Sequence, residues 1–67
     1  MKTFGEKLKA LRKEKAMSHL QLANMLCTTQ STVGKYERGE LQTSLETLKL
    51  ICEILDVSAD YLLGLED

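Results

Sequence analysis

Histidine and cysteine are scarce in this sequence of 67 residues, which has one histidine, His19, and two cysteines, Cys27 and Cys52. A structural zinc site gathers about four such ligands, and three scattered residues do not supply them. The sequence also lacks a paired set of catalytic polar groups and a loop of the kind that cradles phosphate. We therefore expect no metal, no cofactor and no enzymatic activity.

Long hydrophobic runs are absent as well. No apolar segment approaches the roughly 20 residues that span a bilayer, and the first residues do not resemble a secretory signal. We therefore expect a cytoplasmic protein with no membrane partner. In a reducing cytosol, two free thiols are favoured over the alternative of a Cys27–Cys52 disulfide.

The length allows a single domain, residues 1–67, and leaves no room for a separate ligand-binding domain, so no small-molecule ligand is expected. At this size a stable core is difficult to build without a metal, a disulfide or a partner subunit. A hydrophobic fraction of 43% and a charged fraction of 28%, with a net charge of only −1, favour a folded chain over a disordered one.

Positive and negative charge separate along the chain. Residues 1–39 hold eight basic side chains against three acidic ones, a net charge of +5, and residues 40–67 hold one basic against seven acidic ones, a net charge of −6. One part of the molecule can therefore face a polyanion such as DNA while the other turns away. The alternative is that both parts are ordinary solvated surfaces.

Capping residues and apolar spacing predict an all-α protein, and no segment shows the alternation of a strand. Thr3 with Glu6, and Ser18 with Gln21, have the spacing of capping boxes at two helix starts. The predicted helices span about residues 4–15, 18–26, 29–39, 44–55 and 59–63. Apolar residues at helical spacing form the expected inner faces: Phe4, Leu8, Leu11, Leu22, Ala23, Leu26, Val33, Tyr36, Leu45, Leu48, Ile51, Cys52 and Leu55.

The segment from residue 18 to residue 37 has the layout of a helix-turn-helix, with two capped helices of about eight residues and a short turn between them. Ala23 is small where the second helix must approach closely, and Leu22 and Val33 can fill the angle between the helices. By itself this pattern is only moderately specific, because other small helical bundles show something similar.

Four sequence blocks raise the specificity: MSHLQLA at 17–23, TTQSTV at 28–33, KYERG at 35–39 and SLETL at 44–48. Together they resemble the Cro/cI-type (lambda repressor-like, XRE) helix-turn-helix family of phage and bacterial regulators. The resemblance extends from about Phe4 to Gly64. It implies a compact five-helix fold, binding to double-stranded DNA as a homodimer, and transcriptional regulation that is most often repression.

The resemblance makes the third helix the recognition helix, whose N-terminal residues meet base edges in the major groove. Gln30 is the leading candidate, because glutamine can bond bidentately to N6 and N7 of adenine. Ser31 and Lys35 are expected to project from the same face toward bases. The alternative for Gln30 is an exposed residue at the helix start, and the alternative for Lys35 is a solvated surface lysine.

Phosphate contacts are expected where helices begin and in the loop after the recognition helix, because free N–H groups and the helix dipole attract anions. The alternatives are a pure capping role for Thr29 and an ordinary surface position for His19. The predicted phosphate contacts are Ser18, His19, Gln21, Thr29, Thr32, Arg38 and Gln42.

Several residues depart from the family pattern. His19 stands where glutamine is often found, and Thr43 where proline is frequent. Cys27 replaces the glycine common in the bend and must adopt that backbone without the freedom of glycine. Gly34 lies inside the recognition helix, where it costs about 1 kcal/mol relative to alanine. Either a close approach to DNA or tolerance of a soft helix would explain Gly34.

The acidic end holds more apolar residues than so small a core needs, and we expect some of them to form a symmetric dimer interface. The alternative is that they complete the core of a monomer. A second functional class, a protein-interaction module such as an antitoxin or antirepressor, would use the same surface. The expected interface residues are Leu41, Leu50, Ile54, Tyr61 and Leu65, with Leu62 as a further candidate.

Overall fold

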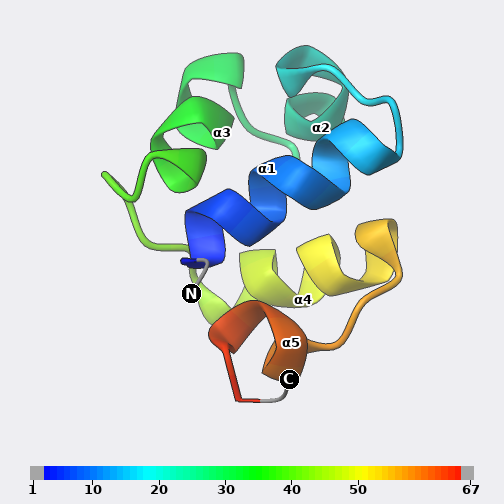
Figure 1. Ribbon diagram of the computed structural model, residues 1–67. Helices are drawn as coiled ribbons and strands as arrows, with labels where there is room; N and C mark the ends of the chain where they lie inside the picture. The colour runs from blue at the N-terminus through cyan, green and yellow to red at the C-terminus, as the bar shows by residue number, and fades with distance from the viewer. Residues whose placement is uncertain (1–2, 66–67) are drawn as a thin grey trace.

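The computed structural model describes residues 3–65, and within them it contains five α-helices and no strand. The helices are α1 (Phe4–Glu14), α2 (His19–Met25), α3 (Gln30–Glu37), α4 (Leu45–Leu55) and α5 (Ala59–Leu63). Helix α1 crosses the middle of the molecule, with α2 and α3 on one side and α4 and α5 on the other (Figure 1). The predicted all-α, five-helix fold is confirmed, although α3 ends at Glu37, two residues before the predicted end.

Each helix begins at a serine or threonine whose side-chain oxygen accepts a hydrogen bond from a backbone N–H of the first turn. The capping boxes predicted for α1 and α2 are both present, with Glu6 and Gln21 bonding back to the cap residue. Such caps stabilise a helix by about 1 kcal/mol each, which matters in a domain this small. The five cap residues are Thr3, Ser18, Thr29, Ser44 and Ser58.

One core connects the helices, and every helix contributes at least one fully buried side chain to it. Leu62 of α5 is only 1% exposed, so its candidacy for a dimer interface was wrong: it belongs to the core. The prediction that Leu45 belongs to the inner face of its helix was also wrong, because Leu45 lies in the first turn of α4 with 84% of its surface exposed. The largest fully buried side chains are Leu8, Leu22, Val33, Ile51, Leu55 and Leu62.

Gly5 sets the distance between α1 and the end of α3. A Cβ atom added to Gly5 would lie 2.7 Å from the carbonyl oxygen of Tyr36 and closer still to that of Glu37. Real Cβ atoms do not approach backbone oxygens this closely, and a backbone cannot step aside as a flexible side chain can. Only glycine therefore permits the close contact of these two helices.

Both cysteines have free thiols, with Cys27 exposed and Cys52 half-buried. Within residues 3–65, no group of three or more His, Cys, Asp or Glu side chains is arranged to hold a metal ion. Over the same range, no helix has the length and apolar character needed to cross a membrane.

Candidate nucleic-acid interface

Helices α2 and α3 pack against each other through Leu22, Ala23 and Val33, each of which is 0% exposed. The turn between them closes when the N–H of Thr28 donates to the carbonyl oxygen of Ala23 over 2.9 Å. Cys27 occupies the bend with φ of 57°, a left-handed conformation that glycine adopts readily and other residues rarely adopt. Cys27 thus takes up the backbone conformation expected at a position where glycine is common. The predicted helix-turn-helix is confirmed (Figure 1).

Helix α3 presents the predicted base-reading residues to solvent. Val33 and Tyr36 turn inward to the core, whereas Gln30, Ser31 and Lys35 are all exposed. Ser31 and Lys35 are four residues apart and therefore lie one above the other on the outer face. The fold thus leaves this face of α3 free for a partner.

The hydroxyls predicted to contact phosphate at the start of α3 also bond each other. Thr29 Oγ1 accepts a hydrogen bond from the N–H of Thr32 over 3.2 Å and lies 2.8 Å from Thr32 Oγ1. The capping role considered for Thr29 is therefore real. At α2, Ser18 and Gln21 are engaged in the same way, with Gln21 Oε1 accepting from the N–H of Ser18 over 2.8 Å.

An ion-pair cluster that the sequence analysis missed fixes α3 against α1. Arg12 Nε donates to Glu37 Oε2 over 2.7 Å, and Arg12 Nη1 donates to the carbonyl oxygen of Met17 over 2.7 Å. The side chains of Arg12 and Glu37 are only 7% and 4% exposed. Each position could have been singled out from the sequence, because Arg12 lies four residues after Leu8 on the inner stripe of α1 and Glu37 belongs to the KYERG block. Neither signal shows that the two residues pair with each other.

His19 joins this cluster from the start of α2, with its Nε2 atom 2.9 Å from Glu37 Oε1. Burial raises the pKa of Glu37, but hydrogen bonds and charge from Arg12 and His19 lower it by more, so the pKa lies below its ordinary value of 4.5. The imidazole predicted to meet phosphate thus already faces a carboxylate, and 37% of its side-chain surface remains exposed.

The loop after α3 begins with an exposed ion pair. Arg38 Nε donates to Glu40 Oε2 over 2.6 Å, and the two side chains are 58% and 54% exposed. Gln42, predicted to contact phosphate, is exposed two residues further on. The hydrogen bond and charge of Arg38 hold the pKa of Glu40 below its ordinary value.

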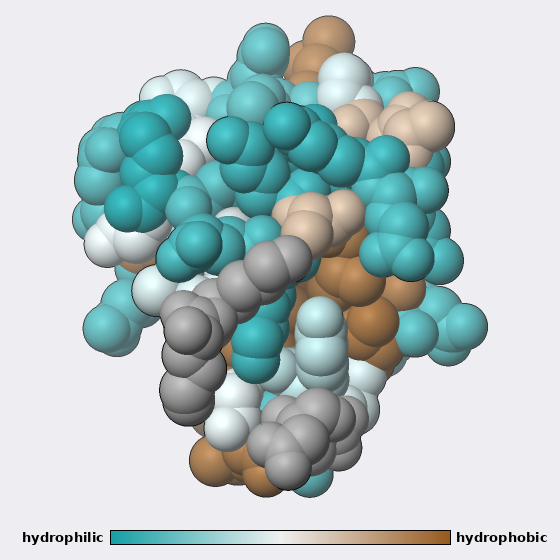
Figure 2. All heavy atoms as spheres, viewed as in Figure 1, coloured by the Kyte–Doolittle hydropathy of each residue, from teal (hydrophilic) through white to brown (hydrophobic). Residues whose placement is uncertain are grey.

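The residues predicted for the dimer interface divide into two groups. Leu41, Leu50 and Leu65 are 45%, 40% and 73% exposed, whereas Ile54 and Tyr61 are half-buried against the core. Lys7 contributes to the packing of Tyr61, since its ammonium lies 4.9 Å from the ring centre and donates to the Tyr61 carbonyl oxygen over 2.8 Å. The face in Figure 2 is mostly hydrophilic over α1–α3, and larger hydrophobic areas appear in the lower half, where α4 and α5 lie.

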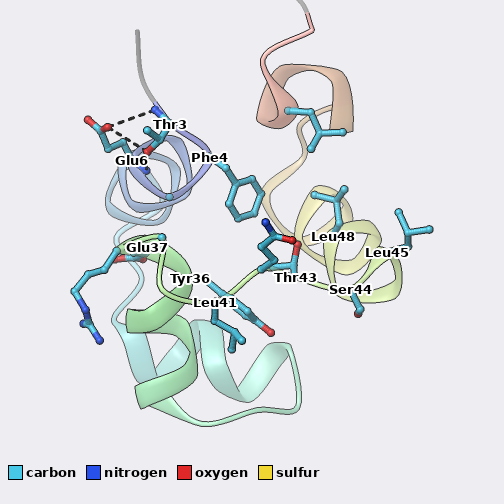
Figure 3. A pocket seen from close by; sticks show the side chains of 15 residues that line it. Thr3, Phe4, Glu6, Tyr36, Glu37, Leu41, Thr43, Ser44, Leu45 and Leu48 are labelled. Carbon is cyan, nitrogen blue, oxygen red and sulfur yellow. Dashed lines mark hydrogen bonds between the residues drawn. The ribbon is translucent and has the colours of Figure 1, made fainter.

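A groove of about 730 Å³ opens between the start of α1, the loop after α3, the start of α4 and the end of α5. Figure 3 shows side chains from several of these elements arranged around it. Leu45 and Leu63, which are 84% and 54% exposed, border this groove and were not predicted for an interface. The apolar residues around the groove are Phe4, Tyr36, Leu41, Leu45, Leu48 and Leu63.

The model of the helix-turn-helix family matches residues 8–62 and includes the whole of α2, the turn and α3. The chain belongs to the Cro/cI-type helix-turn-helix family. The resemblance found in the four sequence blocks is therefore confirmed. A relative in Bacillus subtilis (strain 168), the SPbeta prophage-derived uncharacterized HTH-type transcriptional regulator YonR, is 43% identical over 60 residues, which cover 90% of this chain and 56% of YonR. The chain spans about half the length of the curated relatives it matches.

Solved structures of this family superpose closely on the chain. The P22 c2 repressor in complex with a synthetic operator has a TM-score of 0.92 at 27% identity, and the match covers 98% of this chain and 100% of that one. The hydroxypropylphosphonic acid epoxidase from S. wedmorenis has a TM-score of 0.82 at 36% identity, with 90% of this chain covering 32% of the enzyme. The fold thus also forms part of an enzyme, so any function must be argued from the residues of the site.

Proposed function

We propose that this chain is a sequence-specific DNA-binding transcriptional regulator, a repressor of phage, prophage or bacterial origin that binds a pseudo-palindromic operator as a homodimer. The observation that carries the proposal is the outer face of α3. It presents Gln30, Ser31 and Lys35 to solvent, while Val33 on its inner face is fully buried. A protein of this kind acts in the compartment that holds bacterial DNA, the cytoplasm.

In this proposal α3 enters the major groove, where Gln30 reads adenine and Ser31 and Lys35 reach neighbouring base edges. The starts of α2 and α3, together with the loop after α3, lie along the sugar-phosphate backbone. The net charge of +5 within residues 1–39 favours this orientation. The phosphate contacts would come from Ser18, His19, Gln21, Thr29, Thr32, Arg38 and Gln42.

Pairing of two copies would use the leucine-rich surface at the acidic end of the chain. The support for this step is the exposure of Leu41, Leu50 and Leu65, with Ile54 and Tyr61 partly accessible beside the core. Leu45 and Leu63 are also exposed and lie with Leu41 around the apolar groove. A two-fold axis through this surface would set the recognition helices about 34 Å apart, one turn of duplex DNA.

Selection of bound sites from a random duplex library tests the proposal. The expected result is a motif with two-fold symmetry and half-sites about one helical turn apart. No enrichment would overturn it and would favour the protein-interaction alternative, an antitoxin or antirepressor acting through the apolar groove. Salt dependence separates the two functions, because affinity through phosphate contacts falls steeply with added salt and an apolar interface responds little.

A further inference from the structure

Gly34 lies in the middle of α3, where its missing side chain leaves space that a neighbour fills. It is buried, although it follows Gln30 by one helical turn on the accessible side of the helix. A Cβ atom built on Gly34 would lie 2.9 Å from Arg38 Nη1, and its three nearest neighbours all belong to the guanidinium of Arg38. That guanidinium therefore lies over the backbone at Gly34.

Arg38 reaches this position because it continues the outer stripe of α3. Its backbone has helical angles, with φ of −88° and ψ of −2°, and it follows Ser31 by seven residues and Lys35 by three. Long side chains on a helix lean toward the N-terminus. The charged head is thus carried back by one turn, toward the half of α3 that holds the base-reading residues.

Glu40 holds the guanidinium at one edge. It accepts a hydrogen bond from Arg38 Nε over 2.6 Å. Among residues 3–65, Glu40 is the side-chain partner that the structure shows for Arg38. The Nη1 and Nη2 groups, which lie over Gly34, remain available as donors. Two parallel N–H groups of arginine match O6 and N7 of guanine, the commonest specific contact in the major groove.

We propose that Gly34 is a seat for Arg38, and that this places Arg38 in the major groove to read a guanine beside the bases met by Ser31 and Lys35. The inference rests on the proposed function, and it changes the role of Arg38 from phosphate contact to base reading. It also gives Gly34 a reason for its place in the helix. Its absent side chain makes room for the residue that reads DNA.

The test compares Gly34→Ala, Arg38→Ala and the double variant on two duplexes, a site selected by the native protein and an unrelated sequence, at one salt concentration. We expect Arg38→Ala to bind the selected site about 5- to 150-fold more weakly and the unrelated duplex nearly as well as before. Gly34→Ala should also bind the selected site more weakly, with a large part of the loss expected for Arg38→Ala. Its melting temperature should nevertheless rise by about 4–8 °C, because alanine is the better helix former.

Three outcomes would overturn the inference. Equal loss on both duplexes for Arg38→Ala, with a salt slope reduced by about one, would return Arg38 to a phosphate contact. If Gly34→Ala bound the selected site as tightly as the native protein, the absent side chain of Gly34 would not be needed to position Arg38. If the fold-change in affinity of the double variant equalled the product of the two single fold-changes, Gly34 and Arg38 would act independently. Failure of the proposed function looks different, because the native protein itself would then select no site.

Discussion

Arg12 and Glu37 form a 2.7 Å ion pair in which neither side chain is more than 7% exposed, and the pair joins the end of α1 to the end of α3. The same guanidinium donates to the carbonyl oxygen of Met17, just before α2 begins. One buried group thus fixes the orientation of both helices of the helix-turn-helix. Because breaking such a pair leaves a charge buried without its partner, its removal costs far more than the pair itself contributes.

Glu37→Gln is therefore expected to lower the free energy of unfolding by about 3 kcal/mol or more. Urea denaturation at pH 7, followed by circular dichroism, measures the change. The matched control is Glu40→Gln, which removes the same charge from an exposed pair with Arg38 and should leave stability nearly unchanged. Equal stabilities of the two variants would refute a structural role for the buried pair.

The lowered pKa of Glu37 also predicts how stability depends on pH. Because the folded pKa lies below the ordinary value of 4.5, the unfolded chain takes up a proton first as the pH falls. The contribution of Glu37 is therefore fully present above about pH 4.5 and is lost as the pH falls through the folded pKa. The urea midpoint of the native protein should decrease as the pH is lowered from 7 to 3, and that of Glu37→Gln should decrease less. Parallel curves for the two proteins would contradict this assignment.

Gly5→Ala is expected to destabilise the protein by about 1–3 kcal/mol or more, because the added methyl group would overlap the carbonyl oxygens of Tyr36 and Glu37. Thermal melting of the purified variant measures the effect. Gly34→Ala is the control, since its methyl group would meet only the far end of a side chain. If Gly5→Ala melted at the native temperature, the close approach of α1 and α3 would be wrong.

Much of this architecture could be predicted from sequence because it depends on local chemistry. Thr3 and Ser18 begin helices with caps that need only residues three positions away, and Gly64 ends α5 with a left-handed backbone. The outward face of α3 followed from the inward spacing of Val33 and Tyr36. These features do not depend on distant parts of the chain.

The errors and omissions concern contacts between distant segments. Leu62 and Leu63 are adjacent in a helix of five residues, too short for apolar spacing to show which of them meets the core. Leu45 keeps the spacing of α4 but lies in its first turn, where no helix covers it. The pairing of Arg12 with Glu37 spans 25 residues of sequence, and no local pattern specifies such a partner.

A left-handed backbone at Ala16, with φ of 56°, offers a route to greater stability. A Cβ atom in this conformation costs about 1–2 kcal/mol, which glycine avoids at some loss of chain entropy. Ala16→Gly is therefore expected to stabilise the protein by up to about 1 kcal/mol in urea denaturation. The same substitution inside α1, Ala10→Gly, should instead destabilise it by about 1 kcal/mol. A loss of stability in both variants would contradict the prediction.

Gln30→Ala tests the base-reading role at the start of α3. Gln30 is exposed in the first turn of the helix, so its truncation should leave the fold intact. We expect the selected operator to be bound about 1–3 kcal/mol more weakly, with the affinity for unrelated DNA nearly unchanged, because only base-edge bonds are lost. Competition binding at one salt concentration measures both affinities.

Gln42→Ala is the control for a phosphate contact and should weaken binding to both duplexes alike, since phosphates carry no sequence information. If Gln30→Ala also weakened both duplexes equally, its contact would be with the backbone and the base reading would fall to Ser31, Lys35 and Arg38.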